Sequence, residues 1–152
     1  MMSTLFIART AHGFQLDAAR DLRVRAARKR ALRVSVHFAS AATTLATPEG
    51  RIAIARGDAI IDDGHGHQWG VARDHFDAKY APVAPGLPGD ACPYTSLPTE
   101  ARAIQMSTPF RVRFADGVSE LDGSPGDWLV DYGDGSLGVV SADVFANSYD
   151  LA

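Results

Sequence analysis

Residues 126–140 read GDWLVDYGDGSLGVV, and residues 57–71 read GDAIIDDGHGHQWGV, a related pattern 69 positions earlier. At this shift, nine residues are identical over the 24 positions from 57 to 80, without a gap. Random pairing would give roughly one or two, so the sequence predicts an internal duplication. The identical pairs are Gly57/Gly126, Asp58/Asp127, Asp62/Asp131, Gly64/Gly133, Gly66/Gly135, Val71/Val140, Asp74/Asp143, Phe76/Phe145 and Tyr80/Tyr149.

The shared residue types predict the same local structure twice. A Gly-Asp step between two apolar runs predicts a turn in which the Asp carboxylate accepts backbone N–H groups. The Asp- and Gly-rich residues 62–66 and 131–135 predict β-hairpins. Asp74 and Asp143 are expected to cap short helices, each of which carries a Phe and a Tyr four residues apart that seal it onto a sheet. The expected turn and plug residues are Gly57, Asp58, Phe76, Tyr80, Gly126, Asp127, Phe145 and Tyr149.

The remaining segments are assigned from their patterning. Residues 34–38 and 110–114 alternate apolar and polar side chains, as in a half-buried strand. Residues 81–98 are rich in Pro and Gly, which predicts an ordered but irregular connector. Residues 14–31 are rich in Ala and Arg, both good helix formers, so they predict a basic N-terminal helix.

Together these elements predict an α+β fold with an N-terminal helix and two pseudo-symmetric antiparallel β units, each ending in a short helix. The predicted segments are an N-terminal segment with the basic helix (1–32), a first β repeat (33–82), a Pro/Gly-rich connector (83–101) and a second β repeat (102–152).

Composition limits the class of protein. The 152 residues are 46% hydrophobic, enough for a packed core. The sequence has no apolar run of the roughly 18 residues that a membrane-spanning helix needs and no signal peptide, and its single cysteine, Cys92, suits a reducing compartment. We therefore expect a cytoplasmic protein without a membrane partner. Residues 1–33 carry a net charge of +6 and the remainder −9, which suggests either a nucleic-acid-binding arm or a basic helix on an acidic body.

The second copy resembles the bacterial PGDYG family. The similarity rests on Gly126–Tyr132, on Val139-Val140 and on the Phe145/Tyr149 pair, and it extends over most of residues 33–150. The motif that names the family is aligned with residues 134–138, where only Gly135 and Gly138 match. The resemblance implies a bacterial or phage context and carries no established activity.

One polar cluster is a candidate metal site. His65 and His67 project to one side of an extended segment, and Asp58, Asp63 or His75 could add a third ligand for a divalent metal. The competing interpretation, which we favour, is a solvated hairpin tip rich in turn formers. No cofactor is predicted. The second copy lacks these ligands, because Asp134, Ser136 and Val144 occupy the equivalent places of His65, His67 and His75.

A groove is a second candidate site. Two related sheets would leave a groove between them, with Trp69, Tyr94, Trp128 and Tyr132 as the large side chains able to line it. The carboxylate pairs Asp58/Asp62 and Asp127/Asp131 could serve acid–base chemistry, although a role as turn caps is the favoured interpretation.

The sequence suggests three alternative functions. The first is a non-enzymatic binding or interaction module that recognises a protein partner or a small ligand. The second is a metal-dependent hydrolase that uses the cluster from Asp62 to His75, and the third is nucleic-acid binding through the basic helix, which the acidic body disfavours. The sequence leaves homo-oligomerisation open, and no residue is assigned a catalytic role.

Overall fold

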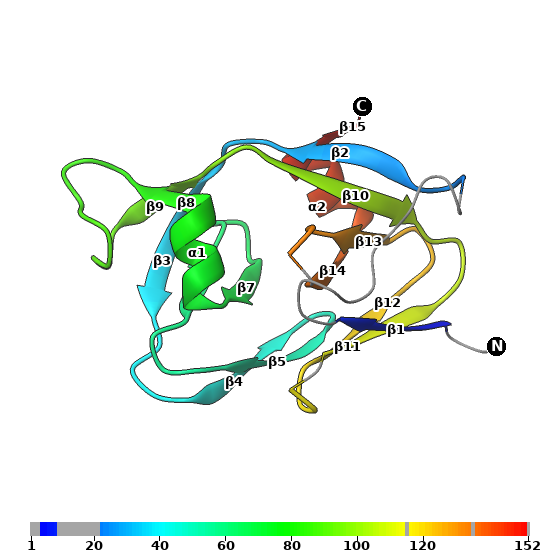
Figure 1. Ribbon diagram of the computed structural model, residues 1–152, viewed down its shortest axis with the longest axis horizontal. Helices are drawn as coiled ribbons and strands as arrows, with labels where there is room; N and C mark the ends of the chain where they lie inside the picture. The colour runs from blue at the N-terminus through cyan, green and yellow to red at the C-terminus, as the bar shows by residue number, and fades with distance from the viewer. Residues whose placement is uncertain (1–3, 9–21, 115, 135, 152) are drawn as a thin grey trace. The chain divides into compact units, whose positions relative to one another are not determined.

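The structure is a computed structural model that describes residues 4–8, 22–114, 116–134 and 136–151 (Figure 1). The chain divides into two compact units. Unit 1 contains both ends of the chain, Met1–Lys29 and Thr99–Ala152, and unit 2 is Arg30–Pro98.

Unit 2 is built on a five-stranded antiparallel sheet with the strand order β7-β6-β3-β9-β8. A seven-residue helix, α1, follows β7 and leads into β8. These elements are β3 (Arg33–Phe38), β6 (Ala59–Asp62), β7 (Gln68–Val71), α1 (Arg73–Lys79), β8 (Tyr80–Pro82) and β9 (Pro93–Ser96).

The interior strand β6, which lies between β7 and β3, is buried on both of its faces. Ala59 and Ile61 join an aromatic cluster with Phe76 of α1, whereas Ile60 packs on the opposite face with Ile54. A strand that is covered on both faces needs a continuous apolar run, which explains the sequence Ala59-Ile60-Ile61. Phe76 of α1 stacks on Tyr80 of β8 with the ring centroids 4.9 Å apart, so this aromatic pair fixes the helix to the sheet.

A hairpin of β4 (Thr43–Thr47) and β5 (Gly50–Ile54) completes unit 2. Its apolar face carries Leu45, Ile52 and Ile54. A Cβ built on Gly70 of β7 would lie only 2.3 Å from the Ile54 Cδ1 atom. The absence of a side chain at position 70 therefore permits close packing of the hairpin on the sheet.

Unit 1 contains a second five-stranded antiparallel sheet, with the strand order β14-β13-β10-β2-β15. Helix α2 follows β14 and leads into β15. These elements are β2 (Arg25–Lys29), β10 (Thr99–Gln105), β13 (Trp128–Asp131), β14 (Leu137–Val140), α2 (Ala142–Ser148) and β15 (Tyr149–Leu151).

An aromatic stack closes the core of unit 1. The Phe145 ring of α2 lies between Trp128, at a centroid distance of 4.0 Å, and Tyr149, at 4.7 Å. The small side chains of Ala101 and Ala103 in β10 pack in the same cluster. As in unit 2, the helix is held by aromatic side chains rather than by its short backbone, which could not be stable alone.

A further sheet in unit 1 contains β1 (Thr4–Ala8), β11 (Phe110–Phe114) and β12 (Glu120–Gly123), with β1 parallel and β12 antiparallel to β11. Phe110 and Val112 are buried, while Arg111 and Arg113 lie on the opposite face of β11. Arg111 pairs with Asp122 at 2.8 Å and with Glu120 at 3.1 Å, and these exposed ion pairs raise the pKa of Arg111.

The predicted α+β class is wrong, because the fold is mostly β, with 49% strand and 11% helix. There is no N-terminal helix in the described residues: the end of the predicted helix, Arg25–Lys29, is strand β2, and residues 14–21 lie outside the described residues. Ala and Arg favour a helix locally, but β2 pairs with β10 on one side and β15 on the other. Two ladders of backbone hydrogen bonds outweigh a weak local propensity.

The prediction of two units that each end in a helix is also wrong. Helices α1 and α2 are each followed at once by a strand, β8 and β15. Strand β2 pairs within the sheet of β13, a hundred residues later in the chain, and β9 from the expected connector pairs with β3. The sheets therefore combine segments from distant parts of the sequence, and the duplication itself stays a prediction.

The helix caps differ from the expected ones. Asp74 and Asp143 lie in the first helical turns, and the N-cap residues are Ala72 and Ser141. Neither described helix is long enough to cross a membrane, since each has seven residues.

Candidate functional site

The predicted metal cluster surrounds the tip of the β6–β7 hairpin. There, Asp63 accepts the backbone N–H groups of His65 and His67, and its Oδ2 lies 2.7 Å from the His67 Nδ1 atom. Burial raises the pKa of Asp63, but these hydrogen bonds and the nearby imidazole outweigh it, so the pKa lies below its ordinary value. The Asp63 carboxylate therefore organises the turn.

The other members of the cluster have separate positions. His65 is exposed at the tip, His75 lies on α1, and Asp58 lies in the turn between β5 and β6. Within the described ranges, no three His, Cys, Asp or Glu side chains are grouped so that they could hold a metal ion. The closest association in the cluster is the Asp63–His67 pair, which provides two ligands at most.

The four aromatic residues expected to line a groove have different environments. Tyr94 is 1% exposed in the core of unit 2, and Trp128 is 7% exposed in the core of unit 1. The Tyr94 hydroxyl donates to the Asp90 carbonyl and accepts from the Gly89 N–H, both at 3.0 Å. These two rings are core side chains rather than walls of a groove, because large apolar surfaces are stabilised most by burial. Trp69 and Tyr132 are half-buried against the same cores.

The repeated Gly-Asp turns have the same hydrogen bonds in both units. The Asp58 carboxylate accepts the Ala55 N–H, and the Asp127 carboxylate accepts the Ser124 N–H, each at 2.9 Å. Asp62 and Asp131 accept the N–H groups of Gly64 and Gly133. Gly57 and Gly126 have φ angles of +89° and +96°, which favour glycine. All four carboxylates thus support backbone turns.

The described end of the basic segment, residues 22–31, does not form a helical surface. In β2, Ala27 is buried, and the Arg28 Nε atom lies 3.7 Å from Glu100 on the neighbouring strand. The arginine side chains of a strand alternate between its two faces, so β2 does not present the single basic face expected of a helix bound to phosphates.

Strand β4 is the clearest free edge. It is the last strand of its sheet and pairs on one side with β5. No second strand pairs with β4 in the part of the chain that the structure describes. Its sequence, Thr43-Thr44-Leu45-Ala46-Thr47, has no charge and no proline, and Thr43, Thr44 and Ala46 are exposed. Natural edge strands are usually protected by charges, prolines or bulges, and β4 has none of these within its length.

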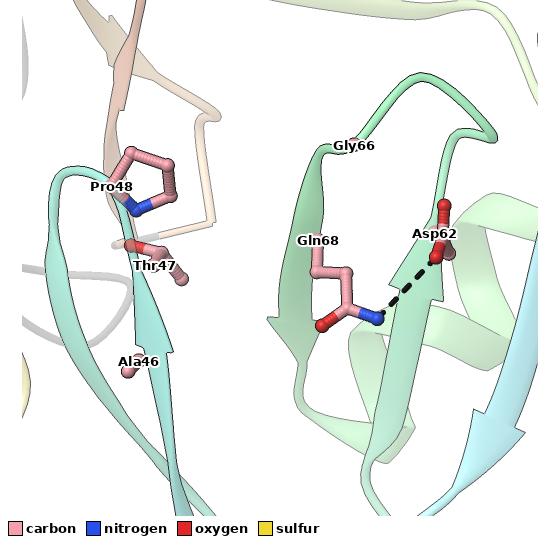
Figure 2. A pocket seen from close by; sticks show the side chains of 6 residues that line it. All are labelled: Ala46, Thr47, Pro48, Asp62, Gly66 and Gln68. Atoms are coloured by element: carbon pink, nitrogen blue, oxygen red, sulfur yellow. Dashed lines mark hydrogen bonds between the residues drawn. The ribbon is translucent and has the colours of Figure 1, made fainter.

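A cavity begins at the end of this strand. Figure 2 shows it between the turn after β4 and the β6–β7 hairpin, with Gln68 and Asp62 joined by a hydrogen bond of 3.4 Å. Its volume is about 210 Å³. The lining residues are Ala46, Thr47, Pro48, Asp62, Gly66 and Gln68.

The sequence did not predict β4 as a site. Its five residues lack a motif, and the available signal was the uncharged, β-branched composition of residues 43–47. That composition indicates a strand, but it does not indicate whether the strand lies at the edge of a sheet.

These observations define a mostly β chain with a free edge strand and two sheets, each of which packs against a short helix through aromatic side chains. The chain belongs to the PGDYG protein family, which matches residues 50–150. No curated protein and no solved structure matches the chain.

The letters of the family name also occur in part at residues 125–127. Pro125-Gly126-Asp127 reproduces the first three letters of the name, and the aromatic Trp128 follows. These residues form the turn from β12 to β13, where Gly126 has a positive φ and Asp127 accepts the Ser124 N–H. The alignment of the naming motif with residues 134–138, which shares two glycines, stays a prediction.

Proposed function

We propose that this protein is a non-enzymatic binding module that recognises an extended segment of a protein partner by adding it as a strand to β4. The single observation that carries the proposal is the free, uncharged edge of β4. The unpaired N–H and C=O groups of an edge strand are complementary to another strand, which identifies a polypeptide as the ligand.

The positions of the polar side chains support binding over catalysis. Asp58, Asp62, Asp127 and Asp131 each accept a backbone N–H, so each has a structural role. A general acid or base must instead direct its carboxyl group at a substrate. The hydrolase hypothesis receives no comparable support from the Asp63–His67 pair, whose shared bond is part of a turn.

The size of the cavity also favours a polypeptide over a small molecule. Small-molecule sites have volumes of roughly 300–1,000 Å³. The cavity beside β4, at about 210 Å³, is smaller than this range and suits a single side chain.

The test is a panel of phage-displayed nine-residue random peptides selected against the intact chain. The variant Thr44→Pro removes one backbone donor from the exposed edge, and Thr44→Val keeps the donor and the branched shape. Along an antiparallel strand, the backbone groups of successive residues point alternately toward the partner strand and away from it. Thr47 pairs with Gly50 at the β4–β5 turn, and Thr44 lies three positions earlier, so its backbone groups point away from β5.

We expect selected peptides to bind wild type and Thr44→Val equally and to bind Thr44→Pro about tenfold more weakly. If Thr44→Pro does not fold, Thr44→Lys replaces it, because a lysine protects an edge without removing a backbone donor. Its control is Thr108→Lys, at an exposed Thr of unit 1. Equal binding of peptides to the edge variant and wild type, or no selected peptide at all, would contradict the proposal.

A further inference from the structure

We infer that the cavity at the end of β4 receives a lysine or arginine side chain of the bound segment, and that Asp62 selects it. This inference rests on the proposed function, because it names the side-chain specificity of the same strand-addition site. Ala46 and Thr47 belong both to β4 and to the cavity wall, so a segment that follows β4 reaches the cavity.

The Asp62 carboxylate has capacity for a further partner. Its Oδ1 atom accepts the Gly64 N–H at 2.7 Å, and its Oδ2 atom is 3.4 Å from the Gln68 Nε2 atom. The second bond is long and therefore weak. A carboxylate can accept about four hydrogen bonds, so Oδ2 can also accept from a cation. Asp62 makes no ion pair with any described residue.

The rest of the cavity suits the aliphatic stem of a basic side chain. Ala46 and Pro48 supply apolar surface on the wall across the cavity from Asp62 (Figure 2). Lysine and arginine place their methylene groups on such surface while the charged end stays near water. The Thr47 hydroxyl both donates to the Gly50 carbonyl and accepts from the Gly50 N–H, which fixes this wall. Gly66 leaves the opposite side open, since nothing lies within 4 Å of a Cβ built on it.

Two nearby charged residues, Arg51 and Asp63, leave the Asp62 carboxylate available to the proposed cation. Arg51 lies opposite Ala46 in the β4–β5 hairpin, but it does not line the cavity. Asp63, the neighbouring carboxylate, is already occupied by His67 and by backbone N–H groups. A basic side chain would thus meet Asp62 rather than a preformed ion pair.

A second copy of this chain is a poorer occupant. Antiparallel pairing of two β4 strands about Leu45 would place residues 41–43, Ala-Ala-Thr, opposite residues 47–49. This segment has no positive charge for Asp62. Charge complementarity therefore favours a basic segment of another protein.

The test uses the peptides selected on the intact chain. Lysine or arginine should be enriched at one position, and its replacement by methionine in a synthetic peptide should weaken binding to wild type about fivefold. Asp62→Asn keeps an acceptor for Gly64 and should bind the lysine and methionine peptides equally. Asp74→Asn, which changes a carboxylate of α1 outside the cavity, should retain the wild-type preference.

The outcomes separate this inference from the proposed function. Peptides that depend on the β4 edge but show no basic preference, or a preference that survives in Asp62→Asn, would overturn the Asp62 assignment alone. A lack of peptide binding, or binding insensitive to the edge variant, would overturn the proposed function and the inference together.

Discussion

The Asp58 carboxylate accepts the backbone N–H of Arg73, the first residue of helix α1, at 3.2 Å. Its other oxygen accepts the Ala55 N–H at 2.9 Å, so one side chain joins the β5–β6 turn to the start of the helix. The N-cap residue of α1, Ala72, has no side-chain oxygen, and Asp58 therefore supplies the cap from 15 residues away.

Removing this connection should destabilise unit 2. We expect Asp58→Ala to lower the free energy of unfolding by about 1–3 kcal/mol, because it leaves backbone donors of two segments without their acceptor. Asp74→Ala, on the exposed first turn of α1, should change it by less than about 1 kcal/mol. Urea denaturation followed by circular dichroism measures both, and equal losses would contradict the capping role of Asp58.

The aromatic stack should dominate the stability of unit 1. Phe145 is 3% exposed and lies between Trp128 and Tyr149, so Phe145→Ala should cost roughly 3–5 kcal/mol. Leu22→Ala is the control, because Leu22 is 95% exposed, and it should cost less than about 0.5 kcal/mol. The fluorescence of Trp128 in a Trp69→Phe background reports the unfolding of this unit. A loss below about 1 kcal/mol for Phe145→Ala would show that the stack is not essential.

Two glycines allow close packing of different kinds. A Cβ on Gly123 would lie 2.1 Å from the Cε1 atom of Phe110, whose ring is rigid and buried. A Cβ on Gly70 would meet the end of the Ile54 side chain, which can rotate. Gly123→Ala should therefore destabilise by about 1–3 kcal/mol and Gly70→Ala by less. Thermal denaturation of both variants gives the order, and a larger loss for Gly70→Ala would contradict it.

Asp63 should make stability depend on acid pH. Its folded pKa lies below the unfolded value of 3.8, because its hydrogen bonds outweigh the opposing effect of burial. The unfolded chain thus binds the proton more readily, so the contribution is complete above the unfolded pKa and is lost as the pH falls through the folded pKa. Asp63→Asn should remove this contribution.

The measurement is the free energy of unfolding between about pH 2 and 6, for wild type and Asp63→Asn. The difference between the two proteins should shrink as the pH falls below 3.8. Asp116 is a second example in unit 1. Burial raises its pKa, but hydrogen bonds from Ser119 and Val118 outweigh this effect, so the pKa of Asp116 lies below its ordinary value. A wild-type advantage that is independent of pH would contradict the role of Asp63.

The sequence by itself determined the local structure wherever the residue types have strong backbone preferences. The Gly-Asp turns, the apolar runs at residues 59–61 and 128–130, and the short helices that carry Phe76 and Phe145 occur where patterning placed them. Tyr80 and Tyr149, which were expected on these helices, begin the strands that follow. Gly permits positive φ angles, and Asp accepts nearby N–H groups, so these signals depend on neighbours in the chain.

Only the tertiary structure decided which strands pair, and therefore where the edges lie. Residues 25–29 have the composition of a helix but become a strand, because β10 and β15 supply hydrogen bonds on both sides. Strand β10 was not predicted, since two of its three buried positions are the small residues Ala101 and Ala103, whose apolar signal is weak. The sequence of residues 43–47 shows only an uncharged composition with β-branched side chains. These residues become a candidate site because β4 pairs with a neighbouring strand on one side only. Pairing between distant segments depends on hydrogen bonds and packing that no local window of sequence contains.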